Sequence, residues 1–228
     1  MPCEGFTVEK FDRLLLPKEP DLSFEMPLWN AGIETVAAID EAGRGPLAGP
    51  VTAAALVLPP RPEVAVFLAG VRDSKQMTPR QRETSLERIR QVALAWGIGF
   101  ASVAEIDTLG ILPATRRAVQ RALDALSFCP DHLLLDCLFL PEVSIPQTSL
   151  VKGDCRSLSI AAASVLAKTA RDALMCALDN QYPGYGFAIH KGYGTAAHRA
   201  AIERLGPCAF HRKTFRIGVK RPDIEQWR

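Results

Sequence analysis

The chain has 228 residues, of which 48% are hydrophobic and 23% are charged. That length suits one domain with a core large enough to fold without disulfide bridges, and the composition excludes membrane-spanning, collagen-like, disordered and disulfide-framework classes. No apolar stretch is long enough for a bilayer, no signal-peptide pattern is present, and the six cysteines lack Cys-x-x-Cys spacing. We therefore expect reduced thiols and a cytoplasmic protein that does not bind membranes.

The net charge of +2 is unevenly distributed along the chain. Residues 1–150 carry 14 Lys and Arg against 19 Asp and Glu, whereas residues 151–228 carry 13 against 6. One interpretation is a metal-binding cluster of carboxylates beside a surface that binds phosphates. The other interpretation is that charge varies by chance along solvated faces, and the asymmetry alone does not decide between the two.

In the first half of the chain, apolar runs predict strands. Residues 1–30 mix prolines with charged residues and are interpreted as an extension with one short amphipathic piece. The apolar runs at 35–39 and 51–58 predict two buried strands, which we expect to pair antiparallel because they are close in sequence. Apolar residues at helical spacing predict a helix over 79–95, and residues 97–103 predict a third strand.

In the second half, predicted strands alternate with predicted helices. We expect a helix over residues 112–126, short buried strands at 132–135 and 149–152, and a long helix over 158–178. An irregular stretch rich in Gly and Tyr follows, and then a last helix over 196–205. This order of elements favours a mixed α/β sheet over an all-parallel one.

A pair of acids and two glycines follow the first predicted strand. Asp40 and Glu41 repel each other unless a cation neutralises them. Gly43 and Gly45 let the backbone approach a ligand closely on either side of Arg44, whose guanidinium suits phosphate. The run lacks the spacing of a dinucleotide-binding fingerprint and leads to a strand rather than a helix. We favour a functional site here, and the alternative is an ordinary charged turn at a strand end.

Two further acids occupy comparable places. Asp136 ends the predicted strand at 132–135, and Asp154 follows the next strand, just before the long helix. Carboxylates at strand ends on one edge of a sheet can converge, and four such acids without a His or Cys cluster favour Mg²⁺ or Mn²⁺ over zinc. The alternative for Asp154 is an acid at a helix start, where the helix dipole stabilises it.

The remaining candidates have less specific patterns. Ser164 and Lys168 share one face of the long helix, and Lys168 either contacts a phosphate or the acids, or forms a structural ion pair. Ser74 and Lys75 lie in a short polar turn. Tyr193 lies between glycines in the Gly- and Tyr-rich stretch, which is either a surface for base stacking and phosphate contact or an ordinary loop.

Taken in order, these motifs resemble the ribonuclease HII family of bacteria. The resemblance covers most of the chain. It is carried by six segments: DEAGRGPLAGP at 40–50, DSK at 73–75, KGD at 152–154, SIAAASVLAK at 159–168, YPGYG at 182–186 and HKGYGT at 190–195. Several motifs in the same order are far more specific than any one of them.

The resemblance implies a fold and an activity. The fold is expected to be a ribonuclease H-like mixed five-stranded sheet flanked by helices, with a catalytic core over 31–182 and a small helical C-terminal part over 183–228. The activity is expected to be endonucleolytic hydrolysis of the RNA strand of RNA/DNA hybrids, with cutting at single ribonucleotides embedded in duplex DNA. Two divalent ions, Mg²⁺ or Mn²⁺, would support it, and the products would carry 3′-hydroxyl and 5′-phosphate ends.

The same resemblance assigns residues to the site. The catalytic and metal-binding acids are Asp40, Glu41, Asp136 and Asp154. The residues that contact the substrate are Gly43, Arg44, Gly45, Ser74, Lys75, Ser164, Lys168 and Tyr193, of which Tyr193 packs on a sugar. The chain departs from the family pattern at residues 76–77, at Cys137, where Gly is often found, and in the tail at 214–228.

Three other functions are weighed against this one. A structure-selective DNA nuclease of the same superfamily would use a similar acid cluster but would not distinguish a 2′-hydroxyl. An actin-like phosphotransferase would need a second domain of the same kind. A non-catalytic nucleic-acid-binding protein has no reason to gather four carboxylates where phosphate must lie. We expect a monomer whose partner is an RNA/DNA hybrid or a ribonucleotide-containing duplex DNA.

Overall fold

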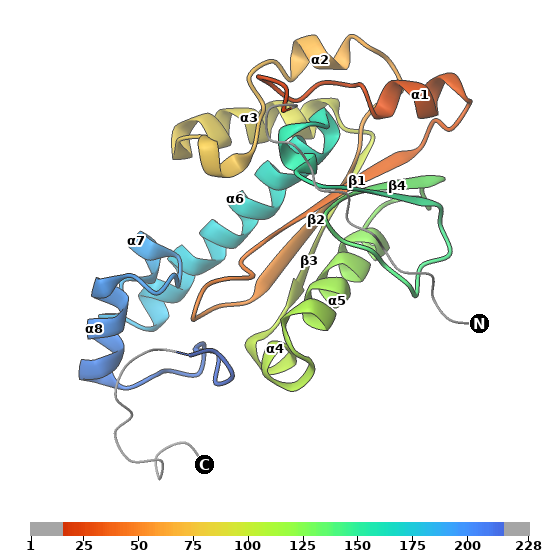
Figure 1. Cartoon of the computed structure of the whole chain (residues 1–228). Helices are drawn as coiled ribbons and strands as arrows, with labels where there is room; N and C mark the ends of the chain where they lie inside the picture. The colour runs from red at the N-terminus through yellow and green to blue at the C-terminus, as the bar shows by residue number, and fades with distance from the viewer. Residues whose placement is uncertain (1–15, 217–228) are drawn as a thin grey trace.

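The computed structural model describes residues 16–216, which form a five-stranded sheet covered by helices (Figure 1). The strands are β1 (Val36–Ala42), β2 (Val51–Val57), β3 (Ala95–Ala101), β4 (His132–Asp136) and β5 (Gln147–Leu150). Their order across the sheet is β3-β2-β1-β4-β5. Residues 1–15 of the expected extension and residues 217–228 of the expected tail lie outside the described residues.

The strand directions make the sheet mixed, which confirms the predicted fold class. β1 runs antiparallel to β2, and β2 to β3, whereas β1 and β4, and β4 and β5, are parallel. The expectation that the first strand stops before Asp40 is wrong. Asp40 and Glu41 continue the ladder opposite Ala54 and Ala53, so both acids lie inside β1 rather than in the turn that follows it.

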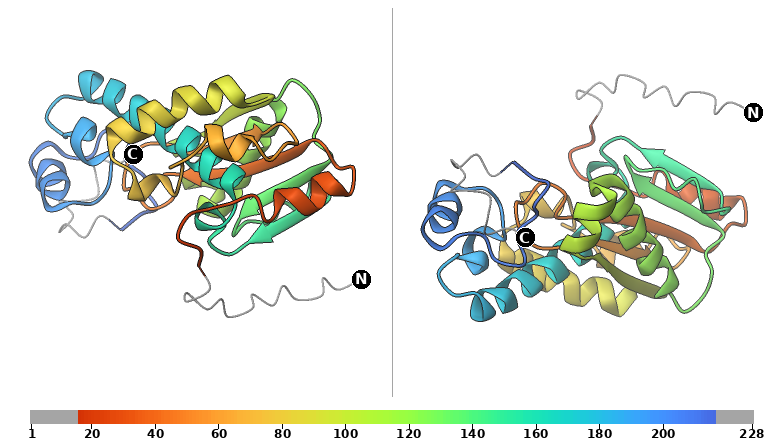
Figure 2. Two further views of the ribbon diagram at one scale, coloured as in Figure 1. Left: turned by 90° about the horizontal axis from the view of Figure 1, so that it is seen from above. Right: turned by 90° about the horizontal axis from the view of Figure 1, so that it is seen from below.

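Helices cover both faces of the sheet. One face carries α1 (Glu25–Asn30), α2 (Val64–Phe67), α3 (Pro79–Val92) and the long α6 (Leu158–Gln181), and the other carries α4 (Val103–Leu109) and α5 (Ile111–Asp124). Figure 2 shows the first face from above and the second from below. Alternate residues of one strand point to opposite faces, so Leu134 packs in the core beneath α6, whereas Leu135 packs in the core beneath α5.

The predicted boundaries around Ser102 are wrong. The sequence pattern extends the third strand to Val103 and starts the next helix at Leu112, but β3 ends at Ala101 and α4 fills the gap. Ser102 caps α4, because its hydroxyl accepts from the backbone N–H of Glu105 and the Glu105 carboxylate accepts from the N–H of Ser102. This Ser-x-x-Glu capping box is visible in the sequence.

Other differences are small. α3 ends at Val92 because Ala95 already belongs to β3, and β5 begins at Gln147 rather than at residue 149. A four-residue helix, α7 (Phe187–His190), interrupts the stretch predicted to be irregular. The last helix, α8 (Ala196–Leu205), has the predicted boundaries.

The small helical C-terminal part packs on the end of α6 and on the loop between β1 and β2 (Figure 1). Its core joins Met175 and Leu178 of α6 to Phe187, Ile202 and, from the loop, Leu47. Residues from opposite ends of the sequence therefore meet at this side of the sheet. Within residues 16–216, no helix combines the length and the apolar character needed to cross a membrane.

Two glycines let α5 lie close to β3. A Cβ atom on Gly97 would lie 2.2 Å from the carbonyl oxygen of Ala122, and one on Gly99 would lie 2.0 Å from that of Ala118. Both oxygens belong to the backbone of a helix, which cannot move aside as a flexible side chain can. The packing of the second face therefore requires residues without side chains at these positions.

We expect Gly99→Ala to lower the free energy of unfolding by about 1–3 kcal/mol, because the added methyl group overpacks the contact and forces α5 to shift. Urea denaturation measures the change, and the slope of the transition should stay the same because the surface exposed on unfolding is nearly unchanged. A loss smaller than about 0.5 kcal/mol would contradict the close approach of helix and strand.

Candidate functional site

Three acidic side chains from different elements meet at the end of the sheet where the parallel strands β1 and β4 finish. Asp40 lies in β1, Asp136 ends β4, and Asp154 lies in η3 (Gly153–Cys155), a short turn before α6. β1 and β4 are parallel neighbours, so Asp40 and Asp136 emerge side by side. Asp40, Asp136 and Asp154 each place one carboxylate oxygen within 4.8 Å of the others.

The charges of this cluster repel one another in a poorly solvated place. Asp40 and Asp154 are only 4% and 3% exposed. Burial raises the pKa of Asp40 well above its usual range, and the charges of Glu41, Asp136 and Asp154 raise it further. Burial, followed by the charge of Asp154, raises the pKa of Asp136 to about 7. The ionised cluster is therefore unfavourable unless a cation neutralises it.

The free oxygens of the cluster suit a hard divalent cation. Asp154 Oδ1 is buried and has no hydrogen-bond partner among the described residues. Asp40 Oδ1 accepts from the N–H of Glu41 at 2.7 Å, and Asp136 Oδ1 accepts from the N–H of Gly153 at 2.7 Å. These bonds orient the carboxylates and leave the second oxygen of each for another ligand. Because carboxylate oxygens are preferred ligands of Mg²⁺ and Mn²⁺, the three acids fit such an ion.

Glu41, the fourth predicted acid, does not belong to this group of three. It follows Asp40 in a regular strand, and adjacent strand residues point to opposite faces. Its Oε1 pairs with Arg44 Nη1 at 3.2 Å. Burial raises the pKa of Glu41, although Arg44 opposes that shift. Glu41 thus lies at the rim of the cluster, near enough to raise the pKa of Asp40.

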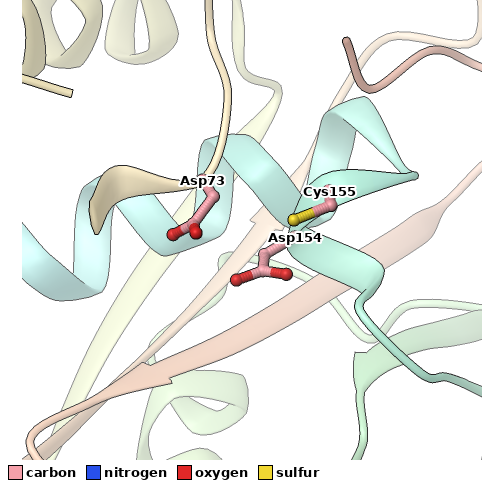
Figure 3. A group of neighbouring side chains, drawn as sticks. All are labelled: Asp73, Asp154 and Cys155. Atoms are coloured by element: carbon pink, nitrogen blue, oxygen red, sulfur yellow. The ribbon is translucent and has the colours of Figure 1, made fainter. Parts of the chain in front are cut away.

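A second group of side chains shares Asp154. Figure 3 shows the carboxylates of Asp73 and Asp154 beside the thiol of Cys155, and one ligand atom from each lies within 4.8 Å of the others. Lys75 Nζ lies 3.6 Å from Asp154 Oδ2 and 4.0 Å from Asp73 Oδ1, so it offsets part of their charge. Burial and the charge of Asp154 raise the pKa of the Cys155 thiol to about 11, which keeps it protonated at neutral pH.

A pocket of about 520 Å³ lies next to the acids, and Lys75 connects the two. The pocket gathers most of the residues predicted from sequence, together with four others. It is lined by Glu41, Ala42, Gly43, Arg44, Gly45, Ser74, Lys75, Ile111, Lys168, Arg171, Tyr193 and Phe215. Basic and aromatic side chains make up half of this lining, whereas the adjoining cluster is acidic.

Lys168 lies at the pocket, whereas Ser164 is buried behind it. Lys168 reaches the pocket and also donates to Asp172 Oδ1 at 2.6 Å, which is the structural ion pair considered above. Ser164 is buried, and its hydroxyl accepts from the backbone N–H of Ser74 at 3.0 Å. Ser164 thereby positions the polar turn η2 (Ser74–Gln76) against α6.

The two glycines of the loop after β1 have different neighbours. A Cβ on Gly43 would lie 2.0 Å from Arg171 Nε, and Gly43 also has a φ of +94°, so packing inside the protein requires this glycine. A Cβ on Gly45 would meet nothing nearer than a ring carbon of Tyr193 at 3.9 Å. Both glycines line the pocket, and Gly45 faces the 43% exposed Tyr193.

Two buried arginines lie outside the residues that the sequence motifs assign to the site. Arg171 and Arg212 are 1% and 0% exposed, and among residues 16–216 neither forms a salt bridge with a carboxylate. Both donate to backbone carbonyls of the loop between β1 and β2. No sequence signal separates them from the other basic residues, because the burial of an arginine depends on remote carbonyls that surround it.

Comparison with solved structures identifies the fold class. The structure matches the ribonuclease H2 from Pyrococcus horikoshii with a TM-score of 0.64 and 25% sequence identity, over 80% of this chain and 94% of that one. The fold and the acid cluster thus define a protein of the type 2 ribonuclease H class, as the sequence motifs predict.

Sequence comparison identifies the family within this class. Residues 37–217 match the family model described as Ribonuclease HII. Proteins of that name from Moorella thermoacetica and Syntrophotalea carbinolica are each 55% identical to this chain, over 194 and 209 residues. The alignments cover 85% and 90% of this chain and 92% and 97% of those proteins. The chain belongs to the ribonuclease HII family.

The two loop glycines yield a matched pair of variants. We expect Gly43→Ala to destabilise the protein by about 1–3 kcal/mol, because its methyl group displaces the Arg171 guanidinium and its φ is unfavourable for alanine. We expect Gly45→Ala to change the free energy of unfolding by less than about 0.5 kcal/mol. Thermal or urea unfolding of both variants measures this, and equal losses would contradict the different surroundings of the two positions.

The raised pKa of Asp136 predicts a pH-dependent stability in EDTA. The folded protein holds a proton on Asp136 between pH 3.8 and about 7 that the unfolded chain has lost. Stability therefore falls as pH rises through this interval. Asp136→Asn should stabilise the metal-free protein at pH 7 by about 1 kcal/mol or more, with little difference near pH 4.

Urea unfolding at both pH values, with and without Mg²⁺, tests this expectation. Saturating Mg²⁺ should stabilise the parent more than the variant, because the variant lacks one anionic ligand. A variant less stable than the parent at pH 7 in EDTA would show that repulsion within the cluster is not the dominant effect.

Proposed function

We propose that this protein is an endonuclease that hydrolyses the RNA strand of RNA/DNA hybrids and cuts at single ribonucleotides embedded in duplex DNA, with Mg²⁺ or Mn²⁺ as its cofactor. The observation that carries the proposal is the convergence of Asp40, Asp136 and Asp154 beside a basic and aromatic pocket. Membership in the ribonuclease HII family supports the same activity.

Asp40, Asp136 and Asp154 would hold two divalent ions, and Glu41 would complete their ligands from the rim. When bound, the ions stabilise negative charge on the attacking and leaving oxygens and activate water for in-line attack on the phosphodiester. The rigid central strands hold the carboxylates in place. Lys75, which is 3.6 Å from Asp154, offsets negative charge where the scissile phosphate would lie. The products carry 3′-hydroxyl and 5′-phosphate ends.

The opposite wall of the pocket is proposed to select the substrate. Gly45 has open space above its Cα, so the backbone there can approach a ribose and contact its 2′-hydroxyl. The exposed ring of Tyr193 lies opposite Gly45, and the sugar of the next nucleotide can pack against it. Arg44 and Lys168 at the pocket contact phosphates, which makes binding weaker as salt concentration rises.

We further propose that the protein acts as a cytoplasmic monomer. Its catalytic unit corresponds to residues 31–182, and residues 183–228 form the part that contacts substrate. Met175 and Leu178 of α6 pack against this second part, so the two are proposed to work as one rigid unit.

Cleavage of three matched duplexes tests the function. One contains a single ribonucleotide, one is an RNA/DNA hybrid, and one is all DNA; each is incubated with Mg²⁺, Mn²⁺ or EDTA. We expect cutting of the first two only, and only with metal. We expect Asp40→Asn to lower the rate about a thousandfold or more, because the cluster loses a metal ligand that stabilises transition-state charge.

Circular dichroism and affinity for the all-DNA duplex are the controls, and both should be unchanged in Asp40→Asn. Cutting of the all-DNA duplex by the parent would favour a DNA nuclease of the same superfamily. Activity of the parent in EDTA, or full activity of the variant, would rule out the metal-dependent mechanism.

A further inference from the structure

The buried guanidinium of Arg212 holds the loop between β1 and β2 from inside the protein. Arg212 Nη2 donates to the carbonyl oxygens of Gly43 at 2.6 Å and Gly49 at 2.8 Å. Its Nη1 donates to that of Arg44 at 2.9 Å, and its Nε donates to Gly49 at 3.0 Å. The hydrogen bonds of this fully buried side chain within residues 16–216 thus all go to loop carbonyls.

The backbone around Arg212 fixes the guanidinium in this place. The N–H of Arg212 donates to the carbonyl of Leu47 at 2.9 Å, and the N–H of Gly49 donates to the carbonyl of Phe210 at 2.8 Å. The segment near the end of the described chain is therefore paired with the loop that follows the first strand. Neither segment can move relative to the other without losing several buried hydrogen bonds.

The geometry of the peptide bond extends this effect to the pocket. In a trans peptide, the carbonyl of one residue and the N–H of the next point in opposite directions, and the described residues contain no cis peptide. Because the carbonyls of Gly43 and Arg44 point at Arg212, the N–H groups of Arg44 and Gly45 point away from it. Neither N–H has an acceptor within residues 16–216, and these three loop residues line the pocket.

A second buried guanidinium, that of Arg171, also holds the loop. Arg171 donates to the carbonyls of Pro50 at 3.0 Å and Ala48 at 3.1 Å, and it packs where a side chain of Gly43 would lie. Burial, followed by the charge of Arg171, lowers the pKa of Arg212 to about 9, which leaves it charged at neutral pH. Within residues 16–216 neither arginine forms a salt bridge, so two positive charges at the pocket wall favour a polyanionic ligand.

We propose that Arg212 is a positioning residue for ribonucleotide recognition, because it turns the N–H groups of Arg44 and Gly45 toward the pocket as donors to a substrate oxygen. Arg212 does not touch the substrate and acts through the loop. The planar guanidinium donates from three separate nitrogens in a fixed fork to three carbonyls, whereas the donors of a lysine ammonium all lie on one nitrogen and do not match this geometry. This inference rests on the proposed function and adds a residue that the motifs did not mark.

The test compares Arg212→Lys with the parent and with Arg204→Lys. Arg204 is the matched control, because it is exposed and donates to the carbonyl of Gly184 at 3.2 Å, in a loop away from the pocket. We expect Arg212→Lys to lower kcat/KM on the single-ribonucleotide duplex about tenfold or more. The affinity for the all-DNA duplex in EDTA should stay within about twofold, since the phosphate contacts are retained.

A second readout separates positioning from general stability. Affinities for the ribonucleotide-containing and all-DNA duplexes are compared in EDTA, well below the unfolding temperature of each protein. We expect Arg212→Lys to lose the preference of the parent for the ribonucleotide, and Arg204→Lys to keep it. Arg212→Gln, which is neutral and shorter, should also lose this preference.

Each outcome decides the proposal. A kcat/KM of Arg212→Lys within about twofold of the parent would overturn it, as would an equal loss of affinity for both duplexes. Failure of both Arg212 variants to unfold cooperatively would also overturn it, because the guanidinium would then be a requirement of the fold. A parent that does not distinguish the two duplexes in cleavage would instead refute the proposed function itself.

Discussion

Mutual repulsion among buried carboxylates is the constraint on which this site depends. Asp40 lies in the central strand, with β2 on one side and β4 on the other, and apolar cores cover both faces. The strands cannot separate to relieve the repulsion without losing those cores. The unfavourable energy of Asp40 beside Asp136 and Asp154 therefore persists in the folded protein and is available to favour a bound cation.

The pocket beside the acids has the opposite electrostatic character and comes from other parts of the chain. The loop after β1, the turn η2, the middle of α6 and the C-terminal part all contribute to its wall. The acidic first part of the sequence supplies three of the four predicted acids, and the basic last part supplies Lys168, Arg171 and Arg212. The near-neutral total charge conceals this division, to which Asp154 is an exception.

Several features could be predicted because they depend on residues close in sequence. Continuous apolar runs indicate the strands, and several motifs in the same order indicate the family. The capping box at Ser102 is equally local, although the apolar pattern predicts no element over most of α4. Cys137 illustrates a different case: its φ of +48° lies in the left-handed region, which accounts for the glycine that the family resemblance leads one to expect there.

By itself, the sequence indicated most of the strands and helices, the family and three acids that cluster in the structure, because these depend on local patterns and on motifs in order. Only the tertiary structure decided that Glu41 lies at the rim of the three clustered acids, that Gly43 is required by Arg171 and that Arg212 holds the loop. The physical reason is that burial and hydrogen bonding of a side chain are set by segments remote in sequence. Arg212 and Gly43, for example, are 169 residues apart.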